Sequence, residues 1–155
     1  MAKKHELDIF CKIANGEISS AKIWEDKDFM AFLDVNPNTT GMALVIPKKH
    51  FNSYAFDMSD REYARLMLAA KKVSRLLEKG LNAKRVAMVM EGMGVNHAHI
   101  KLYPLHGLED KFKEVSGGKR LFYPRYLGYI STQLGPQADM EKLRKLASKI
   151  SKLHK

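Results

Sequence analysis

Three basic side chains, those of His97, His99 and Lys101, alternate with apolar residues along one short segment of the chain. Because successive side chains of a strand point to opposite faces, the three basic groups are expected on one face and the apolar residues in the core. A single histidine on a strand is usually structural. Three basic groups at strict alternation beside a glycine-containing turn are costly to place without a function. The row therefore predicts a chemically active site.

Two chemistries suit this row. In the first, His97 and His99 bind zinc or iron and either His50 or His106 completes the site. The ammonium group of Lys101 argues against a metal because a dication would repel it, and no carboxylate motif near the pair supplies further ligands. In the second, one imidazole attacks phosphorus while neighbouring cations neutralise the phosphate oxygens. Lys101 fits the second chemistry.

Short apolar runs bounded by turn residues predict the strands that must position the row. Three of them, expected to form an antiparallel meander, lie at residues 23–25, 29–33 and 42–46, and two more lie at 86–90 and 98–103. Apolar residues at helical spacing predict two helices. The first occupies residues 8–18 and stops near Gly16, and the second begins at a Ser59–Glu62 capping box and stops at Gly80. This order favours an α+β domain of about five antiparallel strands with the helices against one face.

Regular patterning fails after the last predicted strand. We expect residues 1–106 to form the catalytic domain and residues 107–155 to form an extension packed on it, with an ordered loop at 107–137 and an amphipathic helix at 139–153. The basic face of that helix is interpreted as solvated, and a nucleic-acid contact is the other interpretation. The loop aromatics are interpreted as packing on the domain or on a second subunit: Phe122, Tyr123, Tyr126 and Tyr129.

Length and composition limit the function classes. The chain has 155 residues, 45% hydrophobic and 28% charged, which predicts one folded domain rather than a disordered chain. A net charge of +10 favours anionic partners such as nucleotides, nucleic acids or acidic membranes. No apolar run reaches the ~20 residues of a membrane span and no signal peptide is apparent, so a cytoplasmic protein is expected. The single cysteine, Cys11, excludes an intramolecular disulfide and a CxxC metal motif.

The segment His97–Tyr103, His-Ala-His-Ile-Lys-Leu-Tyr, resembles the H-φ-H-φ-H-φ-φ motif of the histidine-triad family of nucleotide hydrolases and transferases, in which φ is apolar. Further blocks resemble the family in order and spacing, so that the resemblance spans about residues 8–106: Phe10–Ile13, Gly16–Ile18, Phe32–Pro37 and Leu44–His50. It implies a HIT-like fold, a homodimer and no cofactor. It also implies action on the α-phosphate of a purine nucleoside phosphoramidate or dinucleoside polyphosphate.

The resemblance assigns roles to individual residues. His99 matches the nucleophile that forms a nucleotidyl-histidine, and His97 matches the histidine that holds the tautomer of His99 through backbone-linked hydrogen bonds. His50 matches an upstream histidine near the phosphate. Asp34 matches the acid that binds the ribose hydroxyls, although by itself it is interpreted as a turn residue. Four residues match the positions that form the family's apolar slot for the base, and without the resemblance they would be interpreted as core residues: Phe10, Ile13, Phe32 and Val35.

The sequence departs from the family pattern at three places. Lys101 replaces the third histidine, which leaves open whether the protein is a hydrolase or a transferase, because lysine is a poor acid at neutral pH. Met90 and Gly94 stand where the family often has Asn and Ser or Thr, and Gly94 can still offer a backbone N–H. These departures keep two alternatives open: a non-catalytic nucleotide or nucleic-acid binding module, and a metal-dependent hydrolase.

Overall fold

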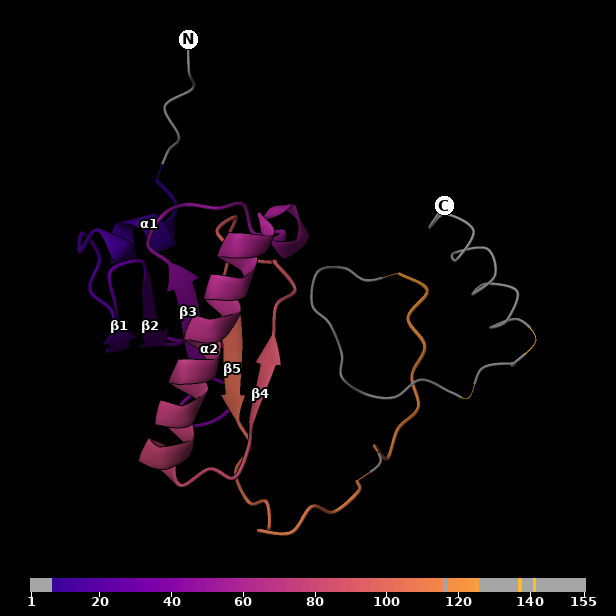
Figure 1. Ribbon diagram of the computed structural model, residues 1–155. Coiled ribbons are helices and arrows are strands. Elements are labelled where there is room, and N and C mark those ends of the chain that lie inside the picture. Colours follow the sequence, from indigo (N-terminus) through magenta and orange to yellow (C-terminus); the bar gives the residue numbers. More distant parts are fainter. Residues whose placement is uncertain (1–6, 116, 126–136, 138–140, 142–155) are drawn as a thin grey trace. The chain divides into compact units, whose positions relative to one another are not determined.

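The structure, a computed structural model, describes residues 7–115, 117–125, 137 and 141, and the chain divides into two units, Met1–Lys113 and Glu114–Lys155. The helices and strands of the first unit follow in chain order (Figure 1): α1 Ile9–Ala14, β1 Lys22–Glu25, β2 Phe29–Leu33, β3 Ala43–Pro47, the 3-10 turn η1 Ala55–Asp57, α2 Asp60–Leu81, β4 Val86–Val89 and β5 Ile100–Pro104.

The five strands form one antiparallel sheet in the order β1-β2-β3-β5-β4. The predicted meander of the first three strands and the α+β class with five strands are therefore confirmed. Helix α2 connects β3 to β4, which leaves room for β5 to pair between them. The two outer strands, β1 and β4, each have a partner on one side only.

Each face of the sheet carries a helix. Helix α2 lies across one face and packs mainly on β3 and β5 (Figure 1), where Leu66, Val73 and Ile100 belong to the larger apolar core. The other face carries α1, whose Phe10 packs with a smaller cluster that includes Phe32. The expectation that the helices share one face was wrong for α1. Strand β2 is buried on both faces of the sheet. The side chains that point to each face therefore need apolar groups to pack against.

Helix α2 begins as predicted and ends two residues later than predicted. The Ser59 hydroxyl accepts a hydrogen bond from the Glu62 backbone at 3.3 Å, as in half of a capping box. Gly80 does not stop the helix. Asn82 does, with a left-handed backbone at φ 51° and its N–H donating to the Glu78 carbonyl oxygen. Asparagine tolerates this conformation better than most residues, so it can end a helix in place of glycine. The prediction that Gly80 ends the helix was therefore wrong.

Strand β5 begins at Ile100 rather than at residue 98. The Ala98 N–H donates to the Phe51 carbonyl oxygen at 2.8 Å, so this stretch is bonded to the loop after β3 before pairing with β4 begins. The connection between β4 and β5 therefore covers residues 90–99, longer than the predicted turn. His97 and His99 lie in this connection.

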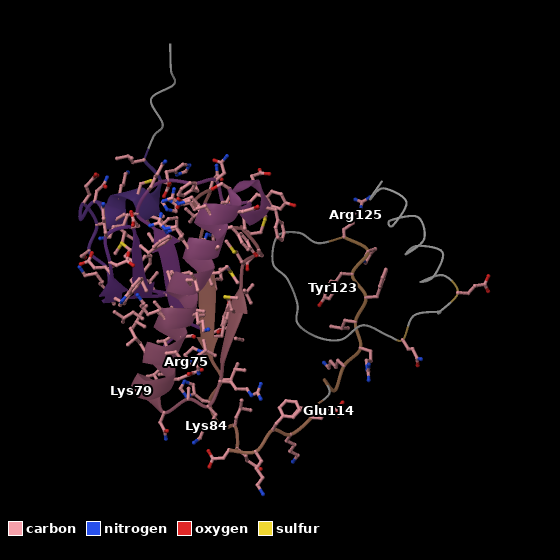
Figure 2. All side chains as sticks on the ribbon, in the orientation of Figure 1. Arg75, Lys79, Lys84, Glu114, Tyr123 and Arg125 are labelled. Atoms are coloured by element: carbon pink, nitrogen blue, oxygen red, sulfur yellow. The ribbon has the colours of Figure 1, made fainter. Side chains whose placement is uncertain are left out.

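Basic side chains gather near the end of α2, where Figure 2 shows Arg75, Lys79 and Lys84. Cations at this end of a helix are favoured by its dipole. Within the described part of the chain, no helix has the length and apolarity to cross a membrane.

In the second unit, residues 117–125 have no helix or strand, as expected for the loop. Tyr126, Tyr129 and all of the predicted helix 139–153 except Glu141 lie outside the described residues. The packing of residues 107–155 on the domain stays a prediction.

Candidate active site

The alternation predicted for the histidine row is present, although the two histidines precede β5. Ala98 and Ile100 belong to the core beneath α2, while the rings of His97 and His99 lie 5.9 and 5.4 Å from the ring of Phe10, on the opposite face. Both histidines are buried. Extended backbone rather than strand pairing is enough to place alternate side chains on opposite faces.

The hydrogen bonds of His99 determine which ring nitrogen can react. Its Nδ1 lies 2.7 Å from the carbonyl oxygen of His97. A carbonyl can only accept, so Nδ1 carries the proton and Nε2 keeps its lone pair. Burial lowers the pKa of His99, the charge of Lys101 lowers it further, and the bond to the His97 carbonyl opposes both. His99 is therefore neutral at neutral pH, with a nucleophilic Nε2.

Both ring nitrogens of His97 have hydrogen-bond partners. Its Nε2 lies 2.8 Å from the carbonyl oxygen of Pro47 and donates to it. Its Nδ1 faces Asp8 and Cys11, at 3.2 Å from Asp8 Oδ2 and 3.5 Å from Cys11 Sγ. His97 thus orients His99 through its backbone carbonyl and uses its ring elsewhere.

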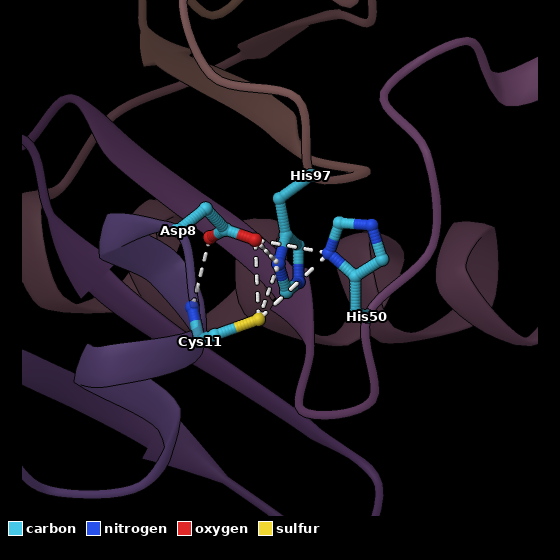
Figure 3. A group of neighbouring side chains, drawn as sticks. All are labelled: Asp8, Cys11, His50 and His97. Carbon is cyan, nitrogen blue, oxygen red and sulfur yellow. Dashed lines mark hydrogen bonds and ion pairs between the residues drawn. The ribbon is translucent and has the colours of Figure 1, made fainter. Parts of the chain in front are cut away.

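The ring of His97 belongs to a cluster that sequence reasoning missed. Figure 3 shows the side chains of Asp8, Cys11, His50 and His97 pointing toward one another. Asp8 Oδ2 lies 2.9 Å from His50 Nδ1 and accepts a hydrogen bond from the Cys11 thiol at 3.1 Å. Its other oxygen accepts the backbone N–H groups of Phe10 and Cys11 at the start of α1. We call these four residues the Asp8 cluster.

Charge in the Asp8 cluster is concentrated on the carboxylate. Burial raises the pKa of Asp8, but the hydrogen bonds from the backbone and thiol of Cys11 and from His97 together hold it well below its usual range. Burial, followed by the neighbouring Asp8 carboxylate, raises the pKa of the Cys11 thiol to about 11. In the absence of a metal, Asp8 is therefore an anion and Cys11 a neutral thiol at neutral pH.

The Asp8 cluster also has the donors of a metal centre. Its four ligand atoms lie within 4.8 Å of one another and comprise one sulfur, two imidazole nitrogens and one carboxylate oxygen, a set that suits zinc. The bond from His97 Nε2 to the Pro47 carbonyl is the outer support typical of a metal-binding histidine. His99 takes no part, so a metal here would hold α1 to the histidine segment rather than activate a substrate.

Two expectations about metal ligands were wrong. A carboxylate does lie beside the histidine row, because the fold brings Asp8 to His97 across 89 positions of the chain. His106, considered as a further ligand, instead has Nε2 at 2.8 Å from the carbonyl oxygen of Thr40 and lies outside the cluster. The sequence signal for the cluster was the Asp8-x-x-Cys11 spacing at the start of a helix, which places both side chains on the same turn.

Lys101 forms an ion pair with Glu91, which lies in the connection between β4 and β5. The Lys101 side chain is 16% exposed and that of Glu91 is 7% exposed. Glu91 was not singled out from the sequence, where it read only as part of a turn. Lys101 is therefore one half of a charge pair rather than a lone cation.

The residues predicted to bind the base and ribose are only partly brought together. Phe10 and Phe32 pack edge to face at 5.8 Å, with Ile13 against the same cluster. Val35 is 90% exposed and lies outside that cluster. Asp34 uses one oxygen as a turn residue, accepting the Asn36 N–H at 2.7 Å.

Gly94, predicted to offer its N–H to phosphate, is exposed and has a left-handed backbone at φ 87°. The described contacts leave untested the nucleotide-binding roles of Gly94, Asp34 and the apolar positions, which stay predictions.

Comparison with known proteins assigns the family. A model of the HIT domain matches residues 15–107, which is more than half of the chain and includes the histidine row. The chain belongs to the HIT family. The resemblance of the sequence motifs is thereby confirmed at the level of the family, with the HIT-like fold.

Individual HIT proteins and solved structures extend the match. A HIT-like protein of Methanocaldococcus jannaschii is 39% identical over 114 residues, covering 69% of this chain and 88% of that protein. The adenosine 5′-monophosphoramidase of Schizosaccharomyces pombe is 34% identical over 97 residues, covering 62% of this chain and 72% of that enzyme. A crystal structure of a Streptococcus mutans protein, 30% identical with a TM-score of 0.71, covers 100% of this chain and 90% of that one.

Proposed function

We propose that this HIT protein is a nucleotide-binding enzyme in which His99 attacks the α-phosphate of a nucleoside 5′-phosphoryl compound. The observation that carries this proposal is the hydrogen bond from His99 Nδ1 to the His97 carbonyl, which leaves the Nε2 lone pair for attack. The similarity to a fission-yeast adenosine 5′-monophosphoramidase supports the same class of substrate.

The reaction proceeds in two balanced steps. In the first, His99 Nε2 forms a bond to the α-phosphorus while the bond to the leaving group breaks and its electron pair departs with that group. The ring becomes cationic, and its Nδ1 proton stays hydrogen-bonded to the His97 carbonyl. In the second step, water or another acceptor attacks phosphorus, the electron pair of the N–P bond returns to Nε2, and the acceptor loses a proton. No metal takes part in either step.

The nucleotide is held by the face of the sheet that carries α1. Phe10, Ile13 and Phe32 form the apolar surface against which a purine packs, and the exposed side chain of Val35 contacts the base. The oxygen of Asp34 that does not cap the turn binds the ribose hydroxyls. His50 and the backbone N–H of Gly94 lie near the phosphate.

The test is release of AMP from adenosine 5′-phosphoramidate and from diadenosine polyphosphates in EDTA. His99→Ala is expected to lower kcat on the order of 10³-fold or more, because it removes the nucleophile. His106→Ala is the matched control, since this exposed histidine lies outside the site and its loss is expected to leave kcat unchanged. A nucleotidyl adduct trapped by acid quenching is expected in the wild type and absent from His99→Ala. Turnover that persists in His99→Ala would contradict the proposal.

A non-catalytic binding module is the second candidate, favoured by one observation. Lys101, which the motif resemblance aligns with the third histidine, is paired with the Glu91 carboxylate. Titration calorimetry with AMP separates the candidates, because a module binds AMP but turns over neither substrate. Salt-sensitive binding of RNA without turnover would extend that second candidate to nucleic acid.

We also propose a homodimer joined through α2 and β4. These elements line an apolar groove of about 660 Å³ whose residues include Met67, Leu68 and Met88. Leu68 is 64% exposed and Met88 is 46% exposed. Strand β4 is an outer strand, and its sequence Val-Ala-Met-Val carries no charge to prevent pairing. A second copy of the chain would both cover the apolar groove and pair with the outer edge of β4.

A further inference from the structure

The ion pair beside the nucleophile carries an inference about the leaving group. Lys101 and His99 are alternate residues of one extended segment, and the charge of Lys101 lowers the pKa of His99. Glu91 binds the Lys101 ammonium from the connection between β4 and β5. Since both side chains are largely buried, neither charge is stable there without the other.

A group at the position of Lys101 can help the first step in two ways. It can donate a proton to a leaving group that is too basic to depart as an anion, or it can stabilise negative charge on one that departs as an anion. Proton donation at neutral pH needs a group that readily loses its proton. A lysine ammonium, with a reference pKa of ~10.4, is a poor proton donor at neutral pH.

Stabilising a leaving group that departs as an anion requires a group that keeps its positive charge, and the Lys101–Glu91 pair provides such a group. An ammonium group carries a full positive charge, and the bond to Glu91 holds that charge at a defined position. Lys101 is the more exposed of the two side chains, so the cation is the more accessible group and the carboxylate lies farther from solvent. Glu91 is thus a positioning residue, which acts by holding the ammonium in place.

We infer that the Lys101–Glu91 pair makes this protein selective for nucleoside 5′-phosphoric anhydrides over phosphoramidates. The inference rests on the proposed function and names its substrate class. It also separates this chain from the fission-yeast relative, which is named for phosphoramidate cleavage.

The two substrates differ in what their leaving groups need. In an anhydride, the P–O bond breaks as Nε2 of His99 bonds to the α-phosphorus, and the electron pair departs on a phosphate oxygen next to the Lys101 ammonium. No proton is transferred in this step. In a phosphoramidate, the P–N bond breaks, and the departing nitrogen must gain a proton to leave as ammonia or an amine. The paired ammonium of Lys101 does not readily supply that proton.

The experiment compares kcat/KM for diadenosine tetraphosphate with kcat/KM for adenosine 5′-phosphoramidate, both in EDTA. The wild type is expected to favour the tetraphosphate by roughly 10-fold or more, because general acid catalysis, which the amidate lacks here, is worth ~10²–10⁴. Lys101→His is expected to lower this ratio by about 10-fold, mainly through faster phosphoramidate cleavage.

Glu91→Gln tests the positioning residue separately. It keeps the size of the side chain but removes the carboxylate charge that holds the ammonium in place, so the ratio is expected to fall as it does in Lys101→His. Glu78→Gln is the matched control, because it removes the carboxylate of the exposed Arg75–Glu78 pair and is expected to leave the ratio unchanged. Thermal unfolding shows whether each variant folds. If Glu91→Gln does not fold, the ratio measured for Lys101→His alone tests the inference.

The outcomes separate this inference from the proposed function. Turnover that depends on His99 but is faster with the phosphoramidate would overturn the inference alone. An unchanged ratio in folded Lys101→His would do the same, because the pair would then be only structural. Turnover of neither substrate by the wild type would overturn the proposed function and the inference together.

Discussion

Asp8 links two parts of the molecule through its two carboxylate oxygens. One oxygen caps α1, and the other contacts His50, His97 and Cys11. The side chain therefore couples the start of the helix that carries Phe10 to the segment that carries the nucleophile. A change at Asp8 is expected to disturb both the helix and the histidines.

The donors of the Asp8 cluster predict stoichiometric binding of zinc to protein freed of metal with a chelator. Because the pKa of the Cys11 thiol is about 11 without metal, zinc binding is expected to release a proton at neutral pH and to raise Tm. Competition with a chromophoric chelator measures the affinity, and pH recording in weak buffer measures the proton. Cys11→Ala is expected to abolish both signals, whereas His106→Ala keeps them. Wild-type protein that does not retain zinc would leave the cluster as a hydrogen-bonded network.

Gly92 and Gly94 form a matched pair for testing the loop before the histidines. Both have positive φ, but a Cβ at position 92 would lie 2.6 Å from the Ser53 carbonyl oxygen, whereas a Cβ at 94 meets nothing within 4 Å. Gly94→Ala is expected to lower the free energy of unfolding by about 1–2 kcal/mol through backbone strain alone. Gly92→Ala is expected to cost more, since the Ser53 backbone must also move. Urea denaturation measures both, and equal losses would contradict the prediction.

At the scale of elements, α2 covers most of one face of the sheet, and its two ends are determined by individual polar residues. Ser59 caps the start, and the left-handed Asn82 ends the helix after Gly80. The helix therefore reaches Leu81, which packs against the larger core.

Asn82 can be tested by two substitutions of opposite character. Asn82→Val is expected to lower the free energy of unfolding by about 1–2 kcal/mol, because a β-branched residue is strained at positive φ. Asn82→Gly is expected to be neutral or slightly stabilising, since glycine adopts this backbone without strain. Urea denaturation at constant m-value makes the comparison. A destabilised Asn82→Gly would mean that the asparagine side chain itself is needed.

At the scale of the whole molecule, the apolar groove along α2 and β4 is the surface that predicts self-association. Leu68→Glu places a charge in this groove and is expected to convert a dimer into monomers, as measured by size-exclusion chromatography with light scattering. Ile18→Glu, at an exposed position outside the groove, is the control and is expected to leave the mass unchanged. A wild-type monomer would remove the homodimer from the proposal.

Local patterns were sufficient for the type and order of the elements. The apolar run at residues 29–33, the alternation within residues 98–102 and the helical spacing after Ser59 are properties of near neighbours in the sequence, so they can be recognised without the fold. The same applies to the row of His97, His99 and Lys101. Its alternation placed the apolar residues in the core and the basic ones on the other face before any pairing was known.

The ends of the helices and strands, and the presence of a helix on the second face of the sheet, could not be predicted from local patterns. Whether α2 stops at Gly80 or at Asn82 depends on which residue takes the left-handed backbone that ends the helix, and not on glycine propensity alone. Strand β5 starts late because Ala98 bonds to Phe51, which is distant in sequence.

The sequence by itself determined the α+β class, the strand order along the chain, the family motif and the face on which the histidines lie, because these follow from short-range periodicity and spacing. Only the tertiary structure decided the surroundings of those histidines. Asp8 reaches His97 across 89 positions, and Glu91 meets Lys101 from the opposite side of a loop. Such contacts depend on how separate segments pack in the fold, so no local pattern records them, and these contacts determine the hydrogen-bond and ion-pair partners of the groups in the site.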